Sequence, residues 1–335
     1  MKLPGSVVLL LAAATTLPAA KNLEVYFIDV EGGQATLFAP PGGESLLIDT
    51  GWGGFNRRDA GRIAAAAKLA GVKRIDYLLI THFHSDHVGG VAQLAEKLPI
   101  RNFVDHGASV ETGKAAEVLF NTYKDYRSKG NHIQVKPGDK LPVKGLDVTV
   151  VSAGGETIAA ALPGAGQPNP SCATFRKMAP ETGENPQSVG VVVQYGDFRL
   201  ADLGDLTWNK EYDLVCPANK LGTVDAFVVS HHGTESSNSP QLLRALSPRA
   251  AVEEDGAKKG GTTQVWKTLR ETPGLQQTWQ LHFAVAGGKE NNAADPFIAN
   301  IDEVCEGKWL KMTALRDGAF TLENSRNQYQ KSYAK

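Results

Sequence analysis

The chain has 335 residues, and 42% of them are hydrophobic, which is enough to build a sizeable core. Its 35 lysines and arginines are balanced by 36 aspartates and glutamates, so that the formal net charge is −1. This balance argues against a strongly basic nucleic-acid-binding surface, and the composition argues against a disordered chain.

The first 20 residues have the pattern of a secretory signal peptide. Lys2 supplies a positive start, residues 7–14 form a short apolar run, and residues 17–20 offer small side chains for cleavage. The apolar run is shorter than a membrane-spanning helix requires. We therefore expect a secreted or periplasmic protein with no stable membrane insertion after cleavage, and an uncleaved anchor is the alternative.

Apolar periodicity predicts alternating strands and helices along the rest of the chain, beginning with an antiparallel meander. Strands are expected at residues 23–30, 34–39, 45–48, 77–81, 101–104, 132–135, 146–151, 188–195, 198–203, 225–230, 250–252, 279–285, 313–315 and 320–322. Helices are expected at residues 58–70, 90–98, 112–128, 240–246 and 262–271. We predict one domain over residues 21–325, with an irregular Gly-, Pro- and Ala-rich insertion at 155–187 and a C-terminal tail at 326–335.

The densest set of metal-ligand residue types directly follows the predicted strand at 77–81. His82, His84, Asp86 and His87 stand within six residues in the pattern H-x-H-x-D-H. Imidazole nitrogens and carboxylate oxygens at this density suit a divalent metal of the zinc type. A purely structural zinc site is not favoured, because such sites prefer closed coordination by cysteine and histidine.

Other candidate ligands stand far away in the sequence, but they also follow predicted strands. They are Asp49, Asp205 and the pair His231-His232, and each is followed closely by a glycine or lies beside one. Strand ends are common positions for the chemistry of α/β proteins, because the sheet holds the loops that carry the side chains.

These motifs, in this order, resemble those of the metallo-β-lactamase-fold hydrolases. The resemblance covers roughly residues 23–255. It implies an α/β fold of the four-layer αββα type, in which two mixed sheets pack together and helices cover their outer faces. It also implies that Asp49 supports the metal-binding loop and that Asp205 bridges two metals.

The resemblance further implies two divalent metal ions, zinc or alternatively manganese. The implied ligands are His82, His84, Asp86, His87, Asp205 and His232, with His231 as an alternative ligand or a supporting donor. The first two would bind one metal, and the next two would bind the other with His232. A hydroxide between the metals would be the nucleophile, since the metals lower the pKa of water from about 15.7 to about 7. Asp86 would orient this water or move its proton.

Several sequence strings are most similar to the ComEC/Rec2-like branch of these hydrolases, which is implicated in phosphodiester cleavage of nucleic acids. The strings are Phe27-Ile28-Asp29-Val30, Leu47-Ile48-Asp49-Thr50-Gly51, Asn185-Pro186-Gln187-Ser188 and His231-His232-Gly233-Thr234. The chain departs from that branch at Gln34, where its relatives carry an acid. It also lacks the histidine that many family members place before the bridging aspartate. Asn185 and Ser188 stand there instead, as that branch tends to have them.

The site with His82 and His84 thus lacks an obvious third ligand. His106 is one candidate, because it follows a strand that we expect to run parallel to the strand before the histidine loop. It would act as a third ligand or as an acid–base group that contacts the substrate, and a surface or capping role is the alternative. The segment that contains Asn185 and Ser188 is the other candidate.

Three functions are compatible with these features. The first is an exported phosphodiesterase that acts on an oligonucleotide or a small molecule. The second is a hydrolase of carbonyl substrates such as lactones, esters or β-lactams. The third is a metal-binding protein without turnover. The three cysteines, Cys172, Cys216 and Cys305, allow one disulfide and one free thiol in an exported protein, and the sequence leaves both the pairing and the oligomeric state open.

Overall fold

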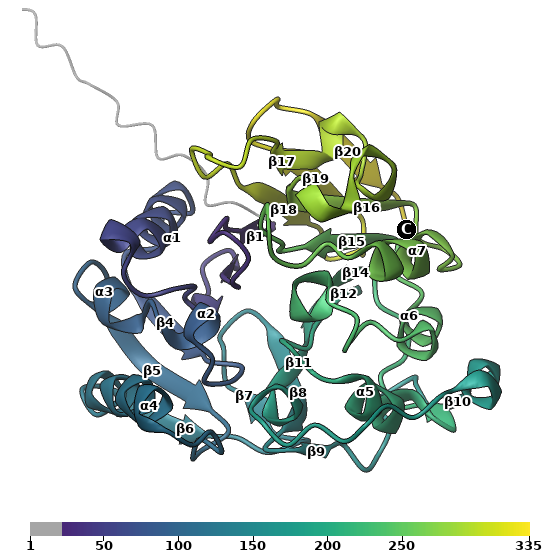
Figure 1. Ribbon diagram of the computed structural model, residues 1–335, viewed down its shortest axis with the longest axis horizontal. Coiled ribbons are helices and arrows are strands. Elements are labelled where there is room, and N and C mark those ends of the chain that lie inside the picture. The colour runs from purple at the N-terminus through teal and green to yellow at the C-terminus, as the bar shows by residue number, and fades with distance from the viewer. Residues whose placement is uncertain (1–21) are drawn as a thin grey trace, which may run out of the picture.

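The computed structural model of the protein describes residues 22–335, so the predicted signal segment lies outside the described residues. Two large mixed sheets pack face to face, and helices lie outside both of them (Figure 1). Within the described residues, no helix combines the length and the apolar character that a membrane crossing needs.

The first sheet has the strand order β20-β19-β18-β1-β2-β3-β4-β5-β6. Its strands are β1 (Leu23–Phe27), β2 (Thr36–Ala39), β3 (Leu46–Ile48), β4 (Ile75–Leu79), β5 (Ile100–Asp105), β6 (Asn131–Gln134), β18 (Leu310–Ala314), β19 (Phe320–Asn324) and β20 (Gln330–Tyr333). The predicted antiparallel meander is β1 to β3, and β3 to β6 run parallel. The sheet is therefore antiparallel at one side and parallel at the other.

The second sheet has the order β17-β16-β15-β14-β12-β11-β8-β7, with β9 paired to β8. Its strands are β7 (Lys140–Leu141), β8 (Asp147–Ala153), β9 (Glu156–Thr157), β11 (Gly190–Tyr195), β12 (Phe198–Asp202), β14 (Ala226–Val228), β15 (Ala250–Glu253), β16 (Gln277–His282) and β17 (Ile298–Asn300). The short strands β10 (Gln167–Pro168) and β13 (Ala218–Asn219) pair separately. The strands from β12 to β17 run parallel, so their carboxyl ends meet at one edge.

The helices cover the two outer faces, as Figure 1 shows for α1, α3 and α4 on one side and for α5 to α7 on the other. The helices are α1 (Arg58–Leu69), α2 (Ser85–Val88), α3 (Val91–Ala95), α4 (Lys114–Arg127), α5 (Trp208–Val215), α6 (Pro240–Leu246) and α7 (Thr263–Arg270). Short 3-10 segments are η1 (Phe55–Arg57), η2 (Pro170–Thr174), η3 (Asn185–Gln187), η4 (Ser230–Gly233), η5 (Val285–Gly287), η6 (Lys289–Asn291) and η7 (Asp295–Phe297).

The buried side chains form a layer between the sheets and a layer under each set of helices. In β4, Leu79 joins the central cluster with Trp279 of the second sheet, whereas the preceding Leu78 packs with Ile63 of α1. This alternation is the expected period of a strand that is covered on both faces. The four-layer αββα arrangement predicted from the sequence is confirmed.

Several element bounds differ from the prediction, and α5 was not predicted, but two differences matter most for the site and the domain bounds. The helix expected at residues 90–98 is shorter, and it is preceded by a separate helical turn, α2, that contains Asp86 and His87. Residues 330–333 were expected to lie in the C-terminal tail, but they form β20 at the edge of the first sheet. Its only buried residue is Tyr333, so the local pattern of β20 is weak, and its pairing with β19 defines it.

The insertion at 155–187 is fixed to the helices of the second sheet. Cys172 and Cys216 form a disulfide across a sequence separation of 44 residues, and Cys305 is free. Next to this bridge, the ring of Phe175 stacks on that of Tyr212 in α5, with centroids 4.0 Å apart. The disulfide and this stack together hold the irregular segment against the folded core.

We predict that the double variant Cys172→Ala/Cys216→Ala loses about 2–4 kcal/mol of unfolding free energy, because the bridge limits the freedom of the unfolded chain. Denaturant unfolding with and without a reducing agent provides the measurement. The reductant should destabilise the wild-type protein to the level of the variant and leave the variant unchanged. Equal stability of the two proteins without reductant would contradict the prediction.

Candidate metal centre

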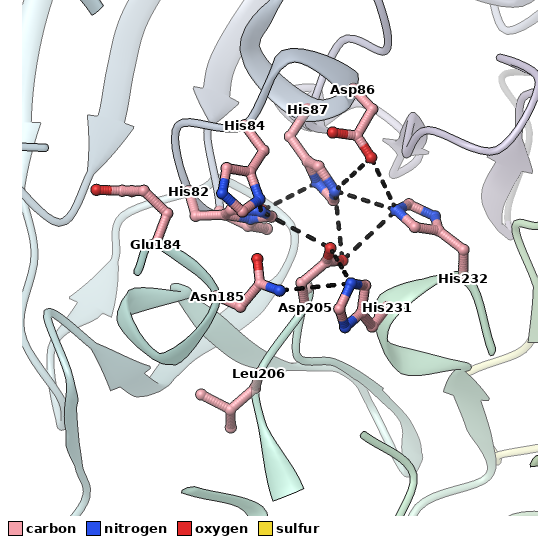
Figure 2. A network of polar contacts seen from close by, with 12 residues as sticks. His82, His84, Asp86, His87, Glu184, Asn185, Asp205, Leu206, His231 and His232 are labelled. Atoms are coloured by element: carbon pink, nitrogen blue, oxygen red, sulfur yellow. Dashed lines mark hydrogen bonds and ion pairs between the residues drawn. The ribbon is translucent and has the colours of Figure 1, made fainter. Parts of the chain in front are cut away.

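The candidate ligands meet where the carboxyl ends of strands from both sheets come together. The histidine loop follows β4 of the first sheet, whereas Asp205 follows β12 and the pair His231-His232 follows β14 of the second sheet. Figure 2 shows these side chains pointing toward one another, with Asp205 between the histidines of the two sheets. The site therefore forms only when the sheets pack face to face.

Four buried side chains make up what we call the first donor group: Asp86, His87, Asp205 and His232. His87 Nε2 lies 3.3 Å from Asp205 Oδ1 and 3.1 Å from His232 Nε2. His232 Nε2 lies 3.3 Å from Asp86 Oδ2. One atom from each residue lies within 4.8 Å of the others, so all four can face a single cation.

The second donor group consists of His82, His84 and the same Asp205. His82 Nε2 is 3.0 Å from His84 Nδ1 and 3.7 Å from Asp205 Oδ2. Asp205 thus presents Oδ1 to the first group and Oδ2 to the second. The predicted role of a bridging aspartate requires this geometry.

His231 lies beside the second donor group rather than the first. Its Nε2 is 3.4 Å from Asp205 Oδ2, and its Nδ1 is 2.9 Å from Ser236 Oγ. His231 and His232 both have a φ of 53°, in the left-handed region, and this tight turn directs consecutive imidazoles toward opposite oxygens of Asp205. His232 occupies the place expected of it, and His231 is close enough to act as a donor near the second group.

Asn185 supplies an oxygen on the side where the second group lacks a third histidine. Its Nδ2 lies 3.4 Å from His231 Nε2, and Figure 2 shows its amide oxygen pointing toward His82 and His84. That oxygen is buried and receives no hydrogen bond from residues 22–335. The hydroxyl of Ser188, the other residue predicted in this segment, is likewise buried and unpaired within the described chain. A cation in the second group would give the Asn185 oxygen a partner.

His106 does not join either donor group among the described residues. Its Nε2 is 3.0 Å from Glu184 Oε2, and this carboxylate also accepts hydrogen bonds from the backbone N–H groups of Phe83 and Val110. The hydrogen bond from His106 helps to hold the pKa of Glu184 below its usual value, against the effect of burial. The structure therefore places His106 behind the histidine loop, where it ties the loop to the insertion.

Asp49 contacts His87 of the first donor group through the ring nitrogen Nδ1. Its Oδ2 lies 2.7 Å from His87 Nδ1 and accepts a hydrogen bond of 2.6 Å from Thr81 Oγ1, while its Oδ1 accepts from the backbone N–H of Thr81. If His87 Nδ1 carries the proton, its Nε2 is free to bind a metal. Asp49 lies in the supporting position that the sequence predicts.

The ionisation of the site matches the chemistry of metal ligands. Burial, together with neighbouring His87, lowers the pKa of His82 well below its usual value. Burial would raise the pKa of Asp205, but His87 and His232 hold it well below the usual value. Metals bind neutral imidazole and ionised carboxylate, which are the forms favoured for His82 and Asp205.

The carboxylates around His87 show that the site needs positive charge, which a bound cation would supply. Burial opposes its protonation, but Asp205, Asp86 and Asp49 raise its pKa well above the usual value. Three buried carboxylates thus surround one imidazole, and Asp205 Oδ1 receives no hydrogen bond within the described chain. Because uncompensated buried charge is costly, the donor set fits divalent cations.

Three charged residues near the site were not singled out from the sequence. Lys259 pairs with Asp86, and its ammonium lies 4.9 Å from the centre of the Trp52 ring. Glu111 Oε1 lies 3.3 Å from His84 Nε2, and Glu184 anchors the loop as described above. Lys259 stands in a glycine-rich loop after a strand, which is a position that sequence analysis can flag.

The chain departs from the ComEC-like pattern at Gln34, and the side chain of Gln34 hydrogen-bonds to Asp202. Its Nε2 donates to both oxygens of Asp202, at 2.9 and 2.8 Å. Burial raises the pKa of Asp202 to about 7. An acid at position 34 would face this carboxylate, so the amide is the suitable partner here.

Comparison with known proteins agrees with this geometry. Residues 28–167 match the family model described as the metallo-beta-lactamase superfamily, and this range includes the histidine loop. The sequence is also 27% identical over 189 residues to ComE operon protein 3 of Bacillus subtilis (strain 168), across 56% of this chain and 20% of that protein. This match agrees with the predicted ComEC-like branch.

Another curated relative is the hydroxyacylglutathione hydrolase of Rhodopseudomonas palustris (strain BisB5). It is 33% identical over 100 residues, across 30% of this chain and 32% of that protein. The chain thus spans no more than a third of the length of either relative.

Among solved structures, Zn(2+)-bound PqqB from Methylobacterium extorquens aligns with 63% of this chain and 73% of its own, at 18% identity and a TM-score of 0.38. A diphosphatase from the PhnP family aligns with 73% of this chain and 81% of its own, at 15% identity and a TM-score of 0.38.

We predict that Asp49→Asn weakens metal binding about 10- to 100-fold, although it removes no ligand of either donor group. The amide would no longer hold His87 in the tautomer that leaves Nε2 free. Competition with a chromogenic chelator measures the affinity.

A matched control for this variant is Asp105→Asn. Asp105 is also buried, but it accepts hydrogen bonds from Tyr123 and Arg127, away from both donor groups. This control should lower stability and leave metal affinity unchanged. Equal metal affinity of Asp49→Asn and wild type would contradict the assigned role.

Proposed function

We propose that this chain, which carries a domain of the metallo-β-lactamase superfamily, is a dinuclear metal-dependent hydrolase of phosphodiesters. One observation carries the proposal: Asp205 is shared by two donor groups, of which the first is fully buried, so that two divalent cations would lie side by side. Such a pair of cations supplies an activated water and offsets the charge that develops on the substrate. We propose zinc for both positions, with manganese as the alternative.

The residues of the chain have separate tasks in this proposal. Asp205 and the histidines hold the cations, and Asp49 keeps His87 in its binding tautomer. Asp86 lies in the first group beside Lys259, where its carboxylate can hold or orient a proton of the attacking water. Packed sheets and the insertion limit access of bulk solvent, which strengthens these charge interactions.

Positive side chains beside the donor groups favour an anionic substrate. The side chain of Lys259 is 34% exposed, and a cation bound to Asp86 would free its ammonium for a substrate oxygen. Lys177 and Lys210 line a separate hollow of about 510 Å³, which also contains two acids, Glu181 and Asp213. A phosphodiester bears the charge that Lys259 would bind, and the resemblance of the motifs to the ComEC/Rec2-like branch supports this class of substrate.

Hydrolysis of a carbonyl substrate, such as an ester, a lactone or a β-lactam, is the second candidate. A groove of about 490 Å³ begins at His84 and runs over Phe83 and the first turns of α4, including Val118 and Leu119. Its lining is mostly apolar and suits an uncharged acyl or leaving group. The similarity to hydroxyacylglutathione hydrolases supports this alternative.

We also propose that the protein is exported. The signal-peptide pattern of residues 1–20 supports export, and so does the Cys172–Cys216 bridge, since disulfides persist mainly in oxidising compartments.

The test compares two neighbouring lysines in the zinc- or manganese-loaded enzyme. Lys259→Ala should lower kcat/KM for bis(p-nitrophenyl) phosphate and single-stranded DNA about 10- to 100-fold, because it removes a charged hydrogen bond to the substrate. Lys258→Ala is the control, since Lys258 is 74% exposed and pairs with Glu303 instead. Metal content is measured for every variant, because Lys259 contacts Asp86.

A neutral lactone and nitrocefin are assayed alongside the phosphodiesters. Turnover of these substrates without phosphodiester cleavage would replace the first candidate with the second. Turnover that survives His84→Ala would contradict a dinuclear metal hydrolase of either kind. Bound metal without turnover of any substrate would indicate a metal-binding protein that lacks catalytic activity.

A further inference from the structure

A second cluster of metal-ligand residue types lies apart from both donor groups. It consists of Asp29 and Glu31 in the loop after β1, His282 at the end of β16 and Cys305 in the segment between β17 and β18. These residues come from three distant parts of the chain. None of them belongs to either donor group, so we call this set the Cys305 cluster.

The donor atoms of the Cys305 cluster converge on a small volume. Cys305 Sγ lies 3.1 Å from Asp29 Oδ2, 3.3 Å from Glu31 Oε1 and 3.9 Å from His282 Nε2. His282 Nε2 lies 2.7 Å from Asp29 Oδ1 and 4.0 Å from Glu31 Oε2. In a tetrahedral zinc site with one sulfur ligand, neighbouring donor atoms lie about 3.3–3.7 Å apart. The observed distances, from 2.7 to 4.0 Å, lie on both sides of this range. Small side-chain rotations would bring the donor atoms to the expected spacing.

The chemical nature of the donors selects the class of metal. One thiol and one imidazole, with two carboxylates, suit a borderline-soft cation such as zinc, whereas magnesium and calcium prefer oxygen ligands alone. Asp29 and His282 are fully buried, and the side chain of Glu31 is 23% exposed. The cluster is therefore largely enclosed but still reachable by an ion.

The neighbouring charges balance when a zinc ion is present. Arg62 of α1 donates to Asp29 Oδ2 at 2.8 Å and to Glu31 Oε1 at 3.2 Å, and its Nη2 lies 3.6 Å from Cys305 Sγ. Two carboxylates and a thiolate carry three negative charges, which one zinc ion and one guanidinium neutralise.

We propose that Asp29, Glu31, His282 and Cys305 bind one zinc ion, in addition to the two ions of the donor groups. This ion ties the C-terminal segment to the loop after β1. The same loop continues to Gln34, whose backbone N–H donates to the carbonyl oxygen of Asp86 at 3.2 Å. The third site thus supports the backbone of the first donor group without contributing to its chemistry.

Cobalt substitution tests the proposal directly, because Cys305 is the only free cysteine among residues 22–335 and neither donor group contains sulfur. The disulfide-intact protein is stripped with a chelator and titrated with Co²⁺. A near-ultraviolet thiolate-to-cobalt charge-transfer band should appear. It should be absent in Cys305→Ser and retained in His84→Ala, which alters only the second donor group.

Metal analysis and thiol reactivity complete the test on the zinc-loaded protein. Wild type should hold one zinc ion more per chain than Cys305→Ser. A bound zinc ion would also shield the Cys305 thiol from a disulfide reagent, so the zinc-loaded protein should react more slowly than the metal-free protein. A wild-type protein that shows no charge-transfer band would overturn the proposal, as would equal zinc content in the two proteins. Neither readout depends on catalytic activity.

Discussion

The structure depends on the burial of one carboxylate, Asp205, between two sets of imidazoles. Its Oδ1 faces His87 and His232, and its Oδ2 faces His82. A buried ionised carboxylate is costly unless charges or hydrogen bonds compensate it, and here the groups that face Asp205 come from both sheets. Packing of the two halves and assembly of the site are therefore one event, since neither sheet alone supplies a complete set of ligands.

A second layer of interactions determines where these ligands can lie. Asp49 orients His87 from the end of β3, and Glu184 ties the backbone of the histidine loop to the insertion. The insertion is in turn held by the Cys172–Cys216 bridge and by Phe175 against α5. An irregular segment thus becomes one wall of the site, because covalent and aromatic contacts replace the strand pairing that it lacks.

Much of the fold follows from local sequence patterns. Pro240 to Leu246 were expected to be helical, and α6 has these bounds, since Ser239 caps the helix and Pro240 occupies its first turn. The resemblance of the ordered motifs to the metallo-β-lactamase-fold hydrolases also predicted that Asp205 and His232 would meet the histidine loop. These features are local, or they follow from the general architecture of the two sheets.

Other features depend on contacts that no local pattern encodes. The alternation of polar and apolar residues around His282 is compatible with an exposed polar face, yet the side chain is fully buried against Asp29, which is 253 residues away in the sequence. His106 had the right position relative to its strand, but the carboxylate of Glu184, from a segment without periodicity, holds it away from the donor groups. Such pairings arise from the tertiary arrangement of irregular segments.

Anomalous diffraction from crystals of the zinc-loaded protein tests the central claim most directly. At the donor groups, the account predicts a pair of anomalous peaks about 3.5–4 Å apart, each in contact with one oxygen of Asp205. One peak should touch His87 and His232, and the other should touch His82 and His84. A single peak at this position, or a pair of peaks of which only one contacts Asp205, would contradict the account.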